Sequence, residues 1–169
     1  MDVANVMGSR PDGWWRDRAG AAVRLYSEVA DLAASGRAVL PGQAGPPDAA
    51  GPVNPPEFVM VLEGAARAAA ARITSAEAAR GPQRETARGP QSEAARGQQG
   101  APTGPGQAPP GRVRVVEARG SGDDAIVDLV RELPGRRVVV TADRALRDRC
   151  AAAGATVLGP AWLLAQLRP

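Results

Sequence analysis

Short apolar runs alternate along this chain with stretches that carry apolar residues at helical spacing, and this alternation limits the possible folds. The runs are FVMVL (58–62), RVRVVEA (112–118), RVVVT (137–141) and ATVLG (155–159). Continuous apolar runs of this length are typical of strands that are buried on both faces of a sheet. Strands that alternate with helices form α/β domains with a mostly parallel sheet. We therefore predict an α/β fold with helices flanking a mostly parallel sheet.

Between and around these runs, the spacing of apolar residues and the capping residues predict four helices. They are expected over 16–35, within 120–133, over 143–153 and over 160–167. A chain of 169 residues with these elements suits a single domain, 1–169.

Two segments are rich in Pro and Gly. We interpret 41–56 as a connector and 76–111 as a disordered low-complexity insertion within the domain. The insertion contains the octads EAARGPQR, ETARGPQS and EAARGQQG, which lack large apolar side chains that could pack. An Arg-Gly RNA-binding segment is the alternative, but each octad lacks aromatic residues and contains a Glu, which favours the first interpretation.

Composition restricts the chemistry that the chain can perform. It has no His and one Cys, so Ser-His and Cys-His nucleophiles and His or Cys metal sites are excluded, and catalysis would depend on carboxylates. The net charge of +3 is compatible with a polyanionic partner. No apolar run approaches the roughly 20 residues that span a bilayer, and no signal peptide is evident, so we expect a cytoplasmic protein.

Acidic residues follow the predicted strands at the edge where α/β proteins place their sites. Glu63 follows the first run, Asp123 and Asp124 follow the second, and Asp143 follows the third. The aspartates could instead cap the helices that begin there. Several converging carboxylates repel one another unless a cation neutralises them, and oxygen ligands without His or Cys indicate Mg²⁺ or Mn²⁺.

Four motifs in order carry a resemblance to a known family. DVANVMGSRPDGWWRDR, VLEG, GSGDDAIVDLV and VVVTADRALRDR, followed by GPAWLL, resemble the NYN domain proteins of the PIN-like nuclease superfamily, especially the actinobacterial YacP-like branch. The resemblance covers both ends of the chain and omits the two Pro/Gly-rich segments. It implies a Rossmann-like, PIN-like sheet and an Mg²⁺- or Mn²⁺-dependent endoribonuclease with RNA as its partner.

Carried over by position, the resemblance implies that Asp2, Asp124 and Asp143 are catalytic metal ligands, with Asp123 and Glu63 as further ligands. Whether Asp123 or Asp124 faces the metal stays open, because neighbouring helical positions point about 100° apart. The implied substrate-binding residues are Asn5, Ser9, Arg10, Trp14, Arg16, Thr141 and Arg144.

The loop after Asp2 has two interpretations. Its arginines could contact phosphates while Trp14 or Trp15 stacks a base. For the tryptophans we favour packing against the first helix, with the arginines solvated or paired with nearby aspartates.

In the family, the first aspartate ends a buried apolar strand, whereas only Met1 precedes Asp2 here. We therefore expect the first strand to be missing from this sequence, either because the true start lies upstream or because the chain is a truncated, inactive copy.

The first functional hypothesis is a metal-dependent ribonuclease that hydrolyses RNA phosphodiesters. The same acids could serve a nucleoside triphosphate pyrophosphohydrolase, although no Walker glycine loop or Lys indicates a P-loop. The third hypothesis is a catalytically inactive RNA-binding relative.

Overall fold

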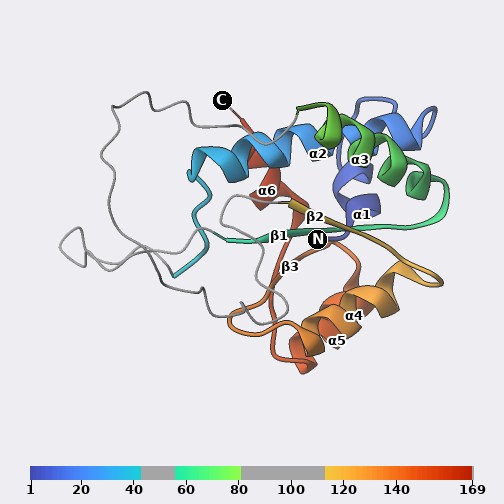
Figure 1. Cartoon of the computed structure of the whole chain (residues 1–169). Coiled ribbons are helices and arrows are strands. Elements are labelled where there is room, and N and C mark those ends of the chain that lie inside the picture. The colour runs from blue at the N-terminus through green and yellow to red at the C-terminus, as the bar shows by residue number, and fades with distance from the viewer. Residues whose placement is uncertain (43–55, 81–112, 169) are drawn as a thin grey trace, which may run out of the picture.

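The structure, a computed structural model, describes residues 1–42, 56–80 and 113–168 (Figure 1). Within these ranges, helices and strands alternate from the first strand onward. In chain order the elements are α1 (Val3–Gly8), α2 (Arg18–Ser35), β1 (Phe58–Leu62), the 3-10 helix η1 (Gly64–Arg67), α3 (Ala68–Arg80), β2 (Val113–Glu117), α4 (Gly122–Glu132), β3 (Val138–Val140), α5 (Arg144–Ala152), β4 (Thr156–Leu158) and α6 (Pro160–Gln166).

The strands form two short parallel pairs. β1 pairs with β2, with Phe58 opposite Val113, and β3 pairs with β4, with Val138 opposite Thr156. The strands of a parallel pair need a crossover connection, and the chain passes through η1 and α3 between β1 and β2 and through α5 between β3 and β4. The described part of the chain therefore confirms the predicted α/β class with parallel strands.

Met1 and Asp2 lie between these two pairs and connect them. The backbone N–H of Asp2 donates to the carbonyl of Val140 in β3 at 3.1 Å, and the N–H of Val61 in β1 donates to the carbonyl of Met1 at 3.1 Å. The amino group of Met1 donates to the carbonyl of Val59. Asp2 also forms a parallel bridge with Val61. Its backbone is therefore paired with strands on both sides.

Apolar side chains of the strands alternate between two clusters, one on each face of the sheet. Met60 and Leu62 join the cluster that includes α1, α2, α3 and α6, whereas Val61 joins the cluster with α4 and α5. Val140 and Val139 of β3 divide between the clusters in the same way. This division follows from the two-residue period of a strand. Figure 1 shows the two groups of helices on opposite sides of the strands.

The N-terminal segment differs from the prediction, because residues Val3–Gly8 form α1 where we expected a loop. Asp2 has extended backbone and its side chain accepts from the N–H of Asn5, which satisfies a donor at the start of the helix. The carbonyl of Asp2 likewise accepts from the N–H of Val6 at 3.1 Å. A short capped helix can thus form even though it ends at Gly8 and Ser9 follows it.

The segment after β1 also differs. No helix is predicted there from the sequence, yet η1 and α3 follow, and the alanine-rich composition of α3 has high helix propensity. Because α3 extends through Arg80, residues 76–80 of the predicted disordered insertion 76–111 are helical. Residues 81–111 of that insertion, and 43–55 of the predicted connector, lie outside the described residues.

No helix in the described part of the chain is long and apolar enough to cross a membrane.

Candidate functional site

The Asp2 carboxylate lies at the point where the two strand pairs meet. It is 6% exposed, and its oxygens accept three hydrogen bonds. Oδ1 accepts from the backbone N–H of Asn5 at 3.1 Å, and Oδ2 accepts from the Asn5 amide at 2.6 Å and from the Thr141 hydroxyl at 2.8 Å. These bonds offset the cost of burying the carboxylate.

Thr141 and Asn5 extend this network to the start of α5. The Thr141 hydroxyl accepts from the N–H of Asp143 at 3.1 Å, and Asn5 Oδ1 accepts from the N–H of Ala142 at 3.3 Å. Thr141 is completely buried. The residues that follow β3 are therefore held to the residues that begin α1. The structure thus brings together Asp2, Asn5, Thr141 and Asp143.

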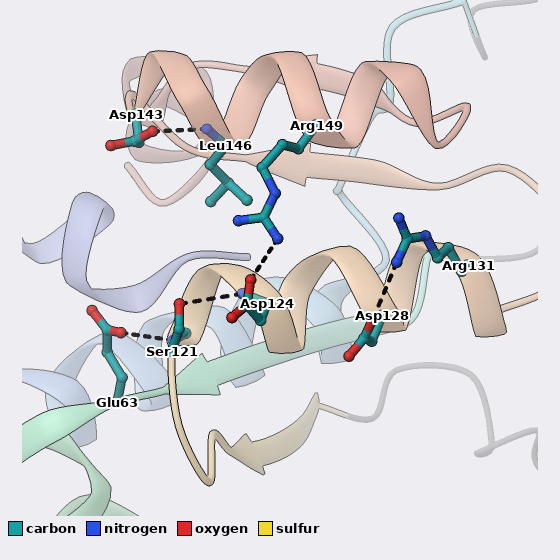
Figure 2. Close-up of polar contacts among 9 residues, drawn as sticks. Glu63, Ser121, Asp124, Asp128, Arg131, Asp143, Leu146 and Arg149 are labelled. Carbon is teal, nitrogen blue, oxygen red and sulfur yellow. Dashed lines mark hydrogen bonds and ion pairs between the residues drawn. The ribbon is translucent and has the colours of Figure 1, made fainter.

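Asp143 is the N-cap of α5, as the capping interpretation predicts. Its Oδ1 accepts from the N–H of Leu146 at 2.8 Å (Figure 2). The residue is exposed, and its Oδ2 has no hydrogen-bond partner among the described residues. One oxygen of Asp143 therefore fixes the helix start while the other remains accessible to a ligand.

Glu63 reaches from the end of β1 to the start of α4. Its Oε2 accepts from the N–H of Gly122 at 2.9 Å, and Ser121 caps the same helix through the N–H of Asp124 at 3.4 Å (Figure 2). A carboxylate at a helix N-terminus interacts favourably with the helix dipole. Glu63 thus links the ends of two elements that carry predicted site residues.

Asp123 and Asp124, which the sequence leaves undistinguished, have different surroundings. Asp124 Oδ1 accepts from the Arg149 guanidinium at 2.5 Å, so Asp124 faces α5 (Figure 2). Asp123 is half-buried and makes no hydrogen bond or ion pair through its side chain to the described residues. The structure therefore leaves Asp123 as the available carboxylate of this pair.

Burial and neighbouring charges both raise the pKa of Asp123. Burial is the largest cause that raises the pKa of this carboxyl above its usual range. The negative charges of Asp143, Asp2 and Glu63 raise it further, in that order, and Arg149 lowers it. Carboxylates from four separate segments of the chain therefore interact at one edge of the sheet.

The Met1 amino group interacts with the charge of Asp2. Burial lowers the pKa of this group from 8.0 to about 6, while the charges of Asp2 and Cys150 oppose that shift. An amine with a pKa near 6 is mostly uncharged at neutral pH. Its charge therefore does little to neutralise the surrounding carboxylates.

The predicted substrate-binding residues on the loop between α1 and α2 are only partly available. Arg10 forms a bidentate ion pair with Glu28, at 2.9 and 2.6 Å, and its side chain is 17% exposed. The Ser9 hydroxyl donates to the Asn5 carbonyl at 2.8 Å.

Trp14 is half-buried and packs against the core, as the packing interpretation predicts. Arg16 is exposed and forms no ion pair within the described ranges. Arg144, at the start of α5, is also exposed.

Sequence reasoning missed two contributors to this edge. Arg149 binds Asp124 from 25 positions away, and no local pattern indicates that pairing. Gly122 allows the close approach of Glu63, because a Cβ there would lie 2.5 Å from Glu63 Oε2. The only available signal was the position of this Gly directly before the two aspartates.

The oxygen donors at this edge suit a hard divalent cation, since Mg²⁺ and Mn²⁺ prefer carboxylate ligands. Within residues 1–42, 56–80 and 113–168, however, no group of three or more Asp, Glu, His or Cys residues is arranged to hold a metal ion. Glu63 and Asp143 each accept a hydrogen bond from a backbone N–H at the start of a helix. Binding a shared cation would therefore require these exposed side chains to rotate.

Comparison of the chain with protein-family models, curated proteins and solved structures finds no match.

Proposed function

We propose that this protein is a metal-dependent ribonuclease that hydrolyses RNA phosphodiesters at the edge where Asp2, Glu63, Asp123 and Asp143 converge. The observation that carries the proposal is the convergence of these four acidic residues, which the contacts of Thr141 with Asp2 and Asp143 and of Glu63 with Gly122 hold at one edge. Burial raises the pKa of Asp123 most, and the charges of the other three carboxylates raise it further. Carboxylates that repel one another in the free protein gain most from a bound cation. The resemblance of the motifs to NYN domain proteins supports the same activity.

Asp123 and Asp143 would hold the ion, with Asp2 and Glu63 as neighbouring carboxylates. A bound Mg²⁺ or Mn²⁺ supplies an acidified water and neutralises charge on a phosphoryl group. Asn5 and Thr141 orient the Asp2 carboxylate through their hydrogen bonds. Asp124 is assigned a positioning role, because its contact with Arg149 joins α4 to α5.

We also propose that the fold is a Rossmann-like, PIN-like sheet and that the protein acts on RNA in the cytoplasm. The strand order β2, β1, Met1–Asp2, β3, β4, with helices on both faces, supports a Rossmann-like, PIN-like sheet. The net charge of +3 supports a polyanionic substrate such as RNA. The absence of His and the single buried Cys fit a hydrolase that depends on oxygen ligands in the cytoplasm.

The test is cleavage of labelled RNA by the purified chain with Mn²⁺, with Mg²⁺ and with a chelator. We expect cleavage with either metal and none with chelator. Asp123→Asn should reduce the rate roughly 100-fold or more, as expected for loss of a metal ligand. Asp128→Asn is the matched control, because Asp128 lies on the same helix but pairs with Arg131 at 3.4 Å.

A second measurement follows metal binding without activity. Mn²⁺ should raise the melting temperature of the wild-type chain in a concentration-dependent way, because a ligand that binds only the folded state stabilises it. The shift should be lost in Asp123→Asn and kept in Asp128→Asn. Turnover of nucleoside triphosphates without RNA cleavage would instead indicate a pyrophosphohydrolase. RNA binding without metal binding or turnover would indicate an inactive relative.

A further inference from the structure

The loop between α1 and α2 lies on the same side of the molecule as the candidate site. Figure 1 shows this loop, and the start of α4, on the side toward which β1 and β2 run. Asp2 caps the N-terminus of α1, and the loop begins after Gly8, the last residue of α1. At ~1.5 Å per residue, this short helix separates them by about 9 Å along its axis.

Trp14 anchors the loop. Its indole packs against the core, and a Cβ at Gly8 would lie 3.7 Å from its Cζ2 atom. The Arg18 guanidinium lies 5.4 Å from the centre of the Trp14 ring, and the backbone N–H of Trp14 donates to Asp12 Oδ1 at 3.1 Å. Trp14 is therefore fixed by contacts on its ring and its backbone, and it supports its neighbour.

Trp15 contacts Trp14 and extends into solvent. Its ring meets that of Trp14 edge to face, with centroids 6.3 Å apart and an interplanar angle of 87°. It is nevertheless 58% exposed, the most exposed large hydrophobic residue in the described part of the chain. Leaving most of an indole in water forfeits the burial that normally stabilises an aromatic residue. An exposed aromatic ring that contacts a core-packed neighbour is suited to stacking.

The charges beside Trp15 favour an anionic partner. Arg16 and Arg18 are exposed on either side of Asp17 in the sequence. The Asp17 carboxylate is turned to the start of α2, where its Oδ1 accepts from the N–H of Gly20 at 2.8 Å. Asp12 is likewise engaged by the backbone of Trp14. The carboxylates of the loop are therefore used internally, whereas Arg16 has no ion-pair partner among the described residues.

We infer that Trp15 stacks on an unpaired base of a single-stranded RNA, with Arg16 contacting the adjacent phosphate. Stacking accepts any base and needs it unpaired, so the surface selects single strands over duplexes. The choice of RNA rests on the proposed function, and the surface would lead the strand toward the carboxylates near Asp2. Trp14 holds Trp15 in place and does not itself stack.

The test measures binding of a short labelled single-stranded RNA with chelator present, so that no cleavage occurs. Trp15→Ala should raise Kd by about 5- to 150-fold, the range measured for one base–aromatic contact. Trp15→Phe should keep part of the affinity. Val39→Ala is the control, since Val39 is 53% exposed and lies outside the loop, and its Kd should match wild type.

Heparin, a polyanion without bases, separates stacking from charge. Trp15→Ala should leave heparin binding unchanged, whereas Arg16→Ala should weaken the binding of heparin and RNA alike. An RNA Kd unchanged by Trp15→Ala would overturn the inference and leave Trp15 as a protein-docking residue. An equal loss of heparin and RNA binding in Trp15→Ala would also overturn it.

The outcome is distinguishable from that of the proposed function. If the chain cleaves no RNA with any metal but Trp15→Ala still weakens RNA binding, the nuclease proposal fails and the stacking surface stands. If cleavage is metal-dependent and Trp15→Ala changes neither RNA affinity nor KM, the stacking surface fails alone.

Discussion

The Thr141 hydroxyl donates a hydrogen bond of 2.8 Å to Oδ2 of Asp2, joining residues 139 positions apart in the chain. The same hydroxyl oxygen accepts from the N–H of Asp143 at 3.1 Å. One buried side chain thus connects the start of the chain to the residue that begins α5. Through these two hydrogen bonds, Thr141 holds Asp2 and Asp143 near each other. Both of these residues belong to the candidate site.

Replacing Thr141 by Val should remove this connection while keeping the size of the side chain. Oδ2 of Asp2 would keep only the Asn5 amide as a donor, and the N–H of Asp143 would lose its acceptor. Loss of one buried partner costs about 1–3 kcal/mol, so we expect the free energy of unfolding to fall by that amount in chemical denaturation.

Two variants make this prediction specific. Thr141→Ser keeps the hydroxyl and should cost about 1 kcal/mol, the value of one methyl group. Thr156→Val is the surface control, because Thr156 is exposed at the start of β4, and it should stay within about 0.5 kcal/mol of wild type. A loss in Thr141→Val no larger than in Thr156→Val would show that the Asp2 contact contributes nothing.

Gly122→Ala should displace Glu63 from the start of α4. A Cβ at Gly122 would lie 2.5 Å from Oε2 and 2.9 Å from Cδ of Glu63, so the carboxylate must move and its hydrogen bond is lost. Alanine normally stabilises a helical position by about 0.5–1 kcal/mol relative to glycine. Here we expect that gain to be cancelled, with a net loss of up to about 2 kcal/mol in thermal or chemical unfolding.

The double-mutant cycle with Glu63 isolates this contact. In a Glu63→Ala background, Gly122→Ala should become neutral or stabilising, because nothing remains to clash. Gly120→Ala is the positional control, since a Cβ there meets nothing within 4 Å. If Gly122→Ala destabilises both backgrounds equally, the cause is not its contact with Glu63.

The strands could be predicted from sequence because their signal is local. FVMVL is apolar throughout, and β1 covers the same residues, Phe58–Leu62. The capping interpretation of Asp143 was confirmed for the same reason, since a cap depends on residues within one turn. Elements whose formation depends only on near neighbours can be read from the order of residues.

Contacts between distant segments could not be predicted. Asp123 and Asp124 have the same local sequence signal, and they are distinguished by Arg149, which arrives from another helix. Trp14 and Trp15 are likewise adjacent and identical, but one packs on the core and the other is exposed. α1 was missed because a helix of less than two turns has almost no periodicity, and its stability comes from Asp2 and the packing of Val3 and Val6.

The electrostatics of Asp123 predict a gain in stability when its charge is removed. Its pKa is raised in the folded protein, so between the ordinary and the raised value the folded state binds more protons than the unfolded state. Well below its ordinary pKa of 3.8 the carboxyl is protonated in both states and contributes nothing. As pH rises through this window the ionised carboxylate becomes a penalty on the folded state, which levels off above the raised pKa.

Asp123→Asn should therefore match wild type at pH 3 and become the more stable protein as pH rises toward 7, as measured by melting temperature in a pH series with chelator. Asp128→Asn, on the same helix, removes an exposed ion pair with Arg131 and should change stability by about 0.5 kcal/mol or less at every pH. Saturating Mn²⁺ should reverse the order at pH 7, because the cation stabilises only the chain that keeps the carboxylate. An Asp123→Asn variant that is less stable than wild type at neutral pH with chelator would show that this carboxylate stabilises the fold instead of straining it.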